Sequence, residues 1–315
     1  MMNLRALRMF VAVVESGGLG RASARLNLSQ PAASRQIHAL EAAFGVPLFQ
    51  RVGRQLQLTS AGEELLPQSR RLLADADLLT ERARALKRGL RGILRVSATP
   101  QLITALLTSF LPSHRHRHPG IEVQLIEGSA ARQRRQLERG EIDLAIMPAT
   151  GTCFPGRLLF PIHALAVARN KHRLGRCGVV DIAEVVNEPL LLLQPEFGSR
   201  ASFDAACEIA QVNARVLLEC TAAHTLIGLA AVGYGVAIVP STTMIQDRRL
   251  RAVPLVLRGA SIGYWEAVCW DPRRLAPPYV ESFVNELTAR ARSACPGRKF
   301  LRRAPPLPKP GEPFG

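Results

Sequence analysis

Along the first 45 positions, apolar residues recur among polar ones at the spacing of short amphipathic helices. In the first stretch the apolar positions recur at intervals of three and four: Leu4, Leu7, Val11 and Val14. This spacing predicts a helix that stops at Ser16-Gly17-Gly18. A second, shorter helix is expected over residues 21–26, and Asn27-Leu28-Ser29 is typical of a tight turn because Asn tolerates the left-handed conformation.

A third helix follows this turn directly. Ser29 is a good N-cap, Pro31 is tolerated in the first turn, and Gly45 ends the helix. Its apolar stripe consists of Ala33, Ile37, Leu40 and Phe44. Three short helices joined by such a turn predict a helix-turn-helix, in which the N-terminal part of the later helix enters the major groove of DNA.

The opposite face of the third helix carries side chains that suit contact with DNA: Gln30, Ala32, Ser34, Arg35 and His38. Gln bonds adenine and Arg bonds guanine in bidentate fashion. Ser29 and the helix N-terminus, with Pro31 in the first turn, are expected to hold a phosphate. The alternative is a small three-helix packing unit without a role in DNA binding.

Residues 48–59 are predicted to form a β-hairpin wing. Gln55 to Leu58 alternates polar and apolar positions, and Gly53 suits the bend. Arg51 and Arg54 lie near the expected tip, where they would contact the DNA backbone or the minor groove.

These residues together resemble the LysR-type transcriptional regulators. The resemblance rests on fragments in register over some sixty positions: Leu4-Arg5-x-Leu7-x-x-Phe10, Ser29-Gln30-Pro31-Ala32-x-Ser34-Arg35-Gln36-Ile37-x-x-Leu40-Glu41, Gly45-x-Pro47-Leu48-Phe49-x-Arg51 and Leu58-Thr59-x-Ala61-Gly62. The resemblance implies that Gln30, Ser34 and Arg35 read bases and that Arg51 and Arg54 belong to the wing.

Residues 60–90 are expected to form one long helix. Ser60-x-x-Glu63 has the form of a capping box, and Pro67 should bend the helix. Its apolar stripe needs a partner, and a second copy of the chain is the simplest one, so a dimer reading an interrupted inverted repeat is predicted. Packing of this helix on its own C-terminal domain is the alternative. The family resemblance implies dimers or tetramers that act with RNA polymerase at a promoter.

Strands alternate with helices over residues 91–295. Strands are predicted at 93–98, 121–126, 142–147, 189–193, 216–219 and 236–239, with helices at 102–111, 130–138, 201–210 and 225–232. This order predicts two α/β subdomains, one of 91–163 with 265–295 and one of 164–264. The resemblance implies an effector-binding domain like a periplasmic binding protein. The predicted fold is therefore a mainly α winged helix-turn-helix over residues 2–59, the linker helix and this α/β domain.

Ligands in open α/β folds bind beyond the carboxyl ends of the strands. The residues at those positions are candidate effector contacts: Thr99, Pro100, Gln101, Ser129, Pro148, Thr150, Gly198, Ser199, Thr221 and His224. Hydroxyls, an amide and helix ends suit a small carboxylate or a similar polar metabolite. Each of these residues has an alternative interpretation as a helix cap or a satisfied turn.

Composition agrees with a nucleic acid partner. Lys and Arg number 41 against 25 Asp and Glu, a net charge of +16. No signal peptide or membrane-spanning run is visible, which predicts a cytoplasmic protein. The six cysteines have no metal-ligand spacing, although Cys207 and Cys220 are candidates for a redox pair.

Three further features bear on function. His114, His116 and His118 alternate with arginine, and His114 shares a helix face with His118, but no carboxylate or cysteine spacing completes a metal site, so no metal is predicted. No catalytic motif or cofactor signature is found. Residues 296–315 are basic and proline-rich, and disorder is expected. The competing function is a solute-binding or catalytic α/β domain with a basic N-terminal extension.

Overall fold

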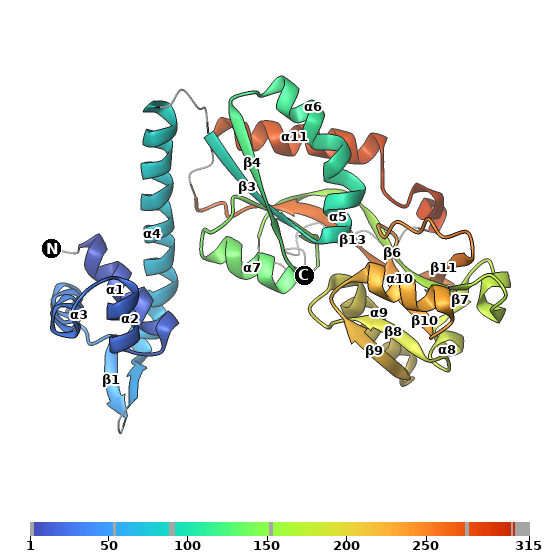
Figure 1. Ribbon diagram of the computed structural model, residues 1–315, viewed down its shortest axis with the longest axis horizontal. Coiled ribbons are helices and arrows are strands. Elements are labelled where there is room, and N and C mark those ends of the chain that lie inside the picture. The colour runs from blue at the N-terminus through green and yellow to red at the C-terminus, as the bar shows by residue number, and fades with distance from the viewer. Residues whose placement is uncertain are drawn as a thin grey trace. The chain divides into compact units, whose positions relative to one another are not determined.

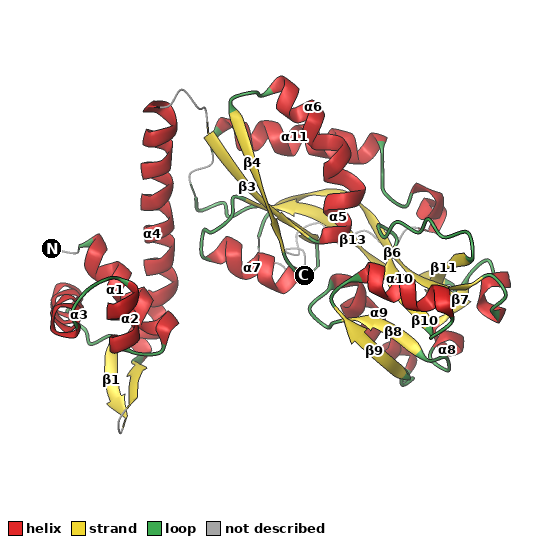
Figure 2. Cartoon of the chain, in the orientation of Figure 1, coloured by secondary structure: helices red, strands yellow, loops and turns green. Residues whose placement is uncertain are grey.

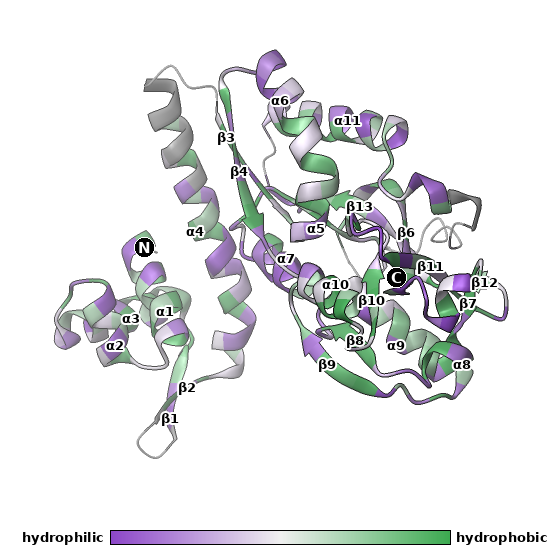
Figure 3. Ribbon diagram, turned by 45° about the vertical axis from the view of Figure 1, so that its right-hand side comes forward, coloured by the Kyte–Doolittle hydropathy of each residue, from purple (hydrophilic) through white to green (hydrophobic). Residues whose placement is uncertain are grey.

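The chain divides into two compact units, the first comprising Met1–Arg91 with the short segment Glu138–Glu141, and the second Gly92–Leu137 with Ile142–Gly315. The computed structural model describes residues 3–52, 55–87, 92–150, 154–274, 277–303 and 305. Helices dominate the first unit, and a sheet with helices on both faces forms the second (Figures 1 and 2). Hydrophobic residues are concentrated in the strands of that sheet (Figure 3).

The first unit contains the three predicted helices: α1 (Leu4–Ser16), α2 (Leu19–Arg25) and α3 (Gln30–Phe44). Gly17 ends α1 and Gly45 ends α3, each in the left-handed conformation. The turn before α3 is made by Asn27, with φ of 53°. Both helix ends and the turn confirm the sequence predictions, and α2 begins two residues earlier than expected. The three helices bury a common core that includes Leu7, Phe10, Val13, Ala33, Ile37 and Leu40.

The predicted wing is an antiparallel hairpin of β1 (Phe49–Val52) and β2 (Gln55–Leu58), with Phe49 opposite Leu58. Glu41 of α3 anchors it. One Glu41 carboxylate oxygen accepts hydrogen bonds from the backbone N–H of Leu48 at 2.8 Å and of Phe49 at 3.2 Å. This carboxylate therefore fixes the start of the wing relative to α3.

Helix α4 (Ser60–Lys87) continues through Pro67. The predicted capping box of Ser60 and Glu63 is wrong, because the cap lies one residue earlier. The Thr59 hydroxyl accepts from the backbone N–H of Gly62 at 3.0 Å and donates to the Pro47 carbonyl at 2.7 Å. A Cβ on Gly62 would lie 2.3 Å from the Leu48 carbonyl oxygen, so this close approach to the wing requires glycine.

The first half of the second unit is built on β3 (Gly92–Ala98), β4 (Ile121–Glu127), β5 (Leu144–Pro148) and β13 (Gly263–Cys269). They lie in the order β4-β3-β5-β13, with β13 antiparallel to β5. Four helical segments cover one face: α5 (Pro100–Leu102), a π-helical turn (Ile103–Leu107), α6 (Thr108–Arg117) and α11 (Pro278–Ser293). Helix α7 (Ala130–Glu138) covers the other face (Figure 1).

The second half contains β8 (Leu190–Leu193), β9 (Val216–Cys220), β10 (Val236–Pro240), β11 (Leu250–Leu257) and the short β7 (Val180–Asp181) and β12 (Ala260–Ser261). A 3₁₀ turn (Arg173–Arg176) precedes β7. Helices α8 (Ile182–Val185) and α9 (Gly198–Ala210) pack on one face of the sheet, and α10 (Ala223–Val232) packs on the other. The leucines of β8 alternate between these two cores, which explains why the strand reads as a continuous apolar run.

The long strand β6 (Gly156–Arg169) connects the two halves. Its residues up to His163 pair with β13, and its residues from Ala164 pair with β10 and β11. One sheet thus runs through the whole unit, and any rotation of one half against the other must bend β6.

Three sequence expectations need correction. The helix predicted over 102–111 is interrupted by the π-helical turn and extends to Arg117. The strands β6, β11 and β13 and the helix α11 were not predicted. The tail predicted to be disordered begins with a 3₁₀ helix (Arg298–Arg303), and the Trp265 indole N–H donates to the Pro305 carbonyl at 3.1 Å. The apolar Phe300 packs against the core beneath α10, which explains this order.

Among the described helices, none combines the length and hydropathy of a membrane span.

Candidate DNA-binding surface and effector cleft

Helix α3 presents its predicted DNA-binding residues on one outward face. The Ser29 hydroxyl caps the helix, accepting from the Ala32 backbone N–H at 3.4 Å. Gln30, Pro31, Arg35 and His38 are exposed, and Ala32 and Ser34 are half-buried. The opposite face buries Ala33, Ile37 and Leu40. The exposed amide of Gln30 and guanidinium of Arg35, with the half-buried hydroxyl of Ser34, have the donors and acceptors that base edges require.

A hollow of about 340 Å³ lies beside this face, between α3 and the start of α1. Arg5 and Arg35 line it from the two helices, and Asn3, the cap of α1, closes it. Two guanidinium groups beside a helix N-terminus suit a phosphate. Sequence reasoning missed Arg5, because only the fold brings it next to Arg35.

The remaining predicted DNA contacts differ in their settings. The His38 Nδ1 atom lies 3.3 Å from the Glu41 carboxylate, so its ring leans along α3 toward the wing. Arg51 is exposed on β1. Arg54 lies outside the described residues. No sequence argument singled out Glu41 as functional, yet its carboxylate joins α3 to the start of the wing.

A cleft of about 750 Å³ lies between the two halves of the second unit. It is lined by the start of α7, the loop after β5, the loop and first turns of α9, and the segment from β12 into β13. Three of the ten predicted effector contacts line it: Pro148, Thr150 and Gly198. The sequence therefore located the strand ends correctly on both sides of this cleft.

The other seven predicted contacts are not among the lining residues: Thr99, Pro100, Gln101, Ser129, Ser199, Thr221 and His224. Thr99 caps α5, accepting from the Leu102 backbone N–H. Gln101 and Ser199 are buried because each faces the core from the first turn of its helix. Thr221 and His224 follow β9, which is the last strand of the sheet, so the end of that strand lies far along the sheet from β5 and β13.

Arg134 is the cation of this cleft, and sequence reasoning missed it. It lies on α7, and neither a hydrogen bond nor an ion pair joins its guanidinium to another described residue. Its Nε atom is buried without a partner. A half-buried guanidinium with free donors is a site for a planar anion, since Arg binds carboxylate and phosphate in bidentate fashion.

The N-terminus of α9 faces the same cleft. Phe197, the residue before the helix, provides no side-chain cap, and Gly198 lines the cleft. A Cβ on Gly198 would lie 2.5 Å from the Pro148 side chain and 3.2 Å from the Tyr264 ring. Glycine at this position therefore lets the helix end approach the opposite wall. The uncapped N–H groups add to the positive potential that Arg134 supplies.

Most of the remaining wall is apolar and includes Met147, Ala205, Ile209, Leu257 and Ile262. Glu196, Ser202 and Ser261 are the polar residues that also line it. Tyr264 also lines the cleft, and burial raises the pKa of its phenol. Two residues along β13 lies Glu266, which is 1% exposed, and neither of its carboxylate oxygens has a partner. Burial raises the pKa of Glu266 to about 8. The cleft thus combines a cationic end with an apolar wall.

Cys207 of the candidate redox pair does not have the chemistry of a sensor thiol. Burial raises the pKa of Cys207 to about 11, and both Cys207 and Cys220 are free cysteines. Reactive cysteines have a lowered pKa, because the thiolate is the nucleophile.

Two family models match the chain. Residues 4–63 match the bacterial regulatory helix-turn-helix protein, lysR family, and residues 87–292 match the LysR substrate binding domain. The N-terminal sixty residues and the α/β unit thus match domains of one family, so the first unit is not a basic extension on an unrelated α/β protein.

Relatives of similar length support the match. The chain is 31% identical over 288 residues to the uncharacterized HTH-type transcriptional regulator YnfL of Escherichia coli strain K12, which covers 89% of this chain and 96% of that protein. It is 34% identical over 256 residues to the HTH-type transcriptional regulator ClcR of Pseudomonas putida, covering 76% of this chain and 83% of that protein.

Solved structures share the fold. The crystal structure of CbnR, a LysR family transcriptional regulator, has a TM-score of 0.64 at 24% identity, covering 92% of this chain and 99% of CbnR. Full-length CbnR complexed with its target DNA has a TM-score of 0.62 at 24% identity, covering 92% and 100%.

Proposed function

Because the chain belongs to the LysR family of DNA-binding transcription regulators, we propose that a small anionic effector in the cleft between the two halves controls its binding to DNA. The observation that carries this proposal is the guanidinium of Arg134 in that cleft, which has no partner among the residues that the structure describes.

We propose that α3 reads bases through Gln30, Ser34 and Arg35. The exposure of Gln30 and Arg35, with the half-buried Ser34 between them, supports the proposal. The hollow beside this face supports it too, because Arg5 and Arg35 would hold a phosphate there and set the depth of the helix in the groove. Arg51 and Arg54 would contact the backbone or the minor groove from the wing.

The protein is further proposed to act as a homodimer or homotetramer on an interrupted inverted repeat, with RNA polymerase recruited or blocked at the promoter. Helix α4 supports the dimer. Leu73 is buried against α1 and its neighbours, whereas Leu72 and Leu79 are 40% and 69% exposed and lie seven residues apart on another face. In coiled coils, apolar residues that recur every seven positions form the stripe that packs against a second helix.

The chemistry of the cleft favours an effector with a carboxylate or similar planar anion on an apolar body. Arg134 and the uncapped N-terminus of α9 would bind the anion. The apolar wall that Met147, Ile209 and Ile262 help to form would cover the rest of the molecule. Because the wall comes from both halves, a bound effector changes the preferred angle between them, and linkage then couples its binding to DNA binding.

The test is a thermal-shift screen of small carboxylates against the full chain, followed by calorimetric titration of the strongest hit. Arg134→Ala should weaken binding of that hit roughly 30-fold, the loss typical when one partner of a charge pair is truncated.

Arg135→Ala is the matched control, since Arg135 lies on the same helix but is exposed and outside the cleft. It should leave the affinity for the hit unchanged. Equal losses in the two variants, or a hit that binds Arg134→Ala as tightly as the unaltered chain, would reject the proposed anion site while leaving the family assignment untouched.

A further inference from the structure

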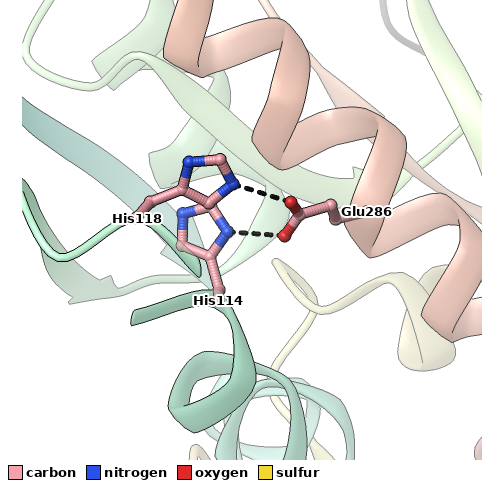
Figure 4. Close-up of side chains that lie close together, drawn as sticks. All are labelled: His114, His118 and Glu286. Carbon is pink, nitrogen blue, oxygen red and sulfur yellow. Dashed lines mark hydrogen bonds and ion pairs between the residues drawn. The ribbon is translucent and has the colours of Figure 1, made fainter. Parts of the chain in front are cut away.

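Two histidines and a glutamate that lie far apart in sequence meet between α6 and α11. His114 and His118 come from the end of α6, and Glu286 comes from the middle of α11 (Figure 4). His114 Nδ1 lies 2.8 Å from Glu286 Oε2, and His118 Nε2 lies 2.7 Å from Glu286 Oε1. Each residue directs one potential metal ligand at a common point, and these three atoms all lie within 4.8 Å of one another.

The surroundings hold these side chains in place. The His114 side chain is 1% exposed, and its ring packs against Phe110 and Phe283 at centroid distances of 5.5 Å and 4.9 Å. The His118 ring lies 4.6 Å from the His114 ring. Glu286 and His118 are 23% and 28% exposed, so the cluster is closed on the His114 side and open to solvent on the other. A fixed set with one open side is the arrangement of a three-ligand site that keeps a water.

We propose that His114, His118 and Glu286 bind a divalent transition metal ion, with Zn²⁺ as the ion that fits best. Two imidazole nitrogens and one carboxylate oxygen form a ligand set that Zn²⁺ commonly takes, and the fourth position would hold water. The His114 proton would then reside on Nε2 and the His118 proton on Nδ1, leaving the nitrogens that face Glu286 free to bind the ion.

Arg117 must be accommodated, because its Nη2 atom lies 2.8 Å from Glu286 Oε2. A carboxylate can bind the metal through one oxygen and keep a hydrogen bond on the other, and such outer partners orient metal ligands. Arg117 is half-exposed, so its charge is screened by water.

The bound ion would clamp α6 to α11. Both helices cover the same face of the first half. The ring centroids of Phe110 on α6 and Phe283 on α11 lie 5.0 Å apart. The site lies on the face of the sheet away from α7, whose first turn lines the effector cleft. The ion would therefore be a second ligand of this half, distinct from the effector.

The test uses the tag-free full chain, stripped with a chelator and titrated with Zn²⁺ in competition with a chromophoric chelator. One Zn²⁺ per chain should bind. His118→Gln and Glu286→Gln should each weaken this binding by more than the ~10–100-fold that loss of an outer partner costs. His116→Ala is the matched control, because His116 lies on the same helix but is exposed and outside the cluster. It should bind Zn²⁺ like the unaltered chain.

A thermal melt separates metal binding from a purely structural role of the cluster. Zn²⁺ should raise the melting temperature of the unaltered chain and of His116→Ala, and should leave His118→Gln and Glu286→Gln unchanged. Co²⁺ should give the visible absorption bands of a tetrahedral site in the same two proteins. No Zn²⁺ bound by the folded chain, or equal binding in all four proteins, would overturn the proposal and leave the cluster as an ion pair between helices.

Discussion

Single side chains of opposite charge set the chemistry around the effector cleft. Arg134 lines the cleft with an unpaired guanidinium, which suits an anion. Glu266 is buried in β13 with neither oxygen satisfied, an arrangement that disfavours its charged form. The first group is available to a ligand, and the second destabilises the fold whenever it ionises.

Replacing Glu266 should change how stability depends on pH. Burial raises the pKa of Glu266 in the folded state to about 8, above its ordinary value of 4.5, so the folded state holds the proton more tightly than the unfolded state. The contribution is fully favourable below about pH 4.5 and is lost as pH rises toward 8. Between pH 5 and pH 8 the unaltered chain should lose on the order of 3 kcal/mol more unfolding free energy than Glu266→Gln.

Urea unfolding of both proteins at the two pH values checks this prediction. Glu127→Gln, which removes an exposed carboxylate from β4, is the control and should keep the pH dependence of the unaltered chain. If Glu266→Gln has that same dependence, Glu266 is ionised and paired in the folded protein, contrary to this account.

Residues whose role is local could be predicted from sequence, and residues whose role is not local could not. Asn27 in its turn and Ser29 as a cap depend on neighbours a few positions away. Arg134 and Glu286 acquire their roles from α9 and α6, which lie far from them along the chain. Glu286 lies about 170 residues after His114 and His118, so their spacing in the sequence gives no sign of the carboxylate that completes the cluster.

Helix α4 shows how one element can serve two partners. Its buried Leu73 and half-buried Leu65 and Leu66 pack on the helix-turn-helix core. Leu72 and Leu79, which continue the stripe that Leu65 begins, remain exposed. The first set makes α4 part of the DNA-binding unit, and the second is available to another copy of the same helix.

Leu79→Glu should therefore weaken self-association. Burying one leucine contributes ~1.5 kcal/mol or more, so losing it from both copies should raise the dimer dissociation constant on the order of 100-fold. Sedimentation velocity over a concentration series measures this constant. Met244→Glu, a change at an apolar side chain of 46% exposure outside α4, should have no effect. If Leu79→Glu stays as dimeric as the unaltered chain, the dimer is built elsewhere.

Helices and strands could be predicted from sequence where their apolar residues recur at a regular spacing. The alternation in β2 and the three-four spacing in α1 identify a strand and a helix without further information. Strand β6 lacks such a period, because both of its faces are buried and Pro161 interrupts the run. Its main partner, β13, lies about a hundred residues later, so no local signal reveals the pairing.

At the scale of the whole molecule, few connections join the two halves of the second unit. Strand β6 passes from one half to the other and pairs with β13 before the crossing and with β10 and β11 after it. An effector that contacts both halves must favour one bend of this strand over another. By linkage, DNA that favours the same bend strengthens effector binding equally.

In the function proposed above, the chain reads specific DNA sequence through α3 as a dimer. The most direct test is selection from a random double-stranded DNA library by the full chain, with Arg35→Ala and Arg54→Ala in parallel. The unaltered chain should enrich an interrupted inverted repeat with half-sites about one or more helical turns apart. Arg35→Ala should relax one position of each half-site, and Arg54→Ala should weaken all binding and flatten its salt dependence. Failure to enrich any sequence, or equal weakening on all DNA by both variants, would contradict the account.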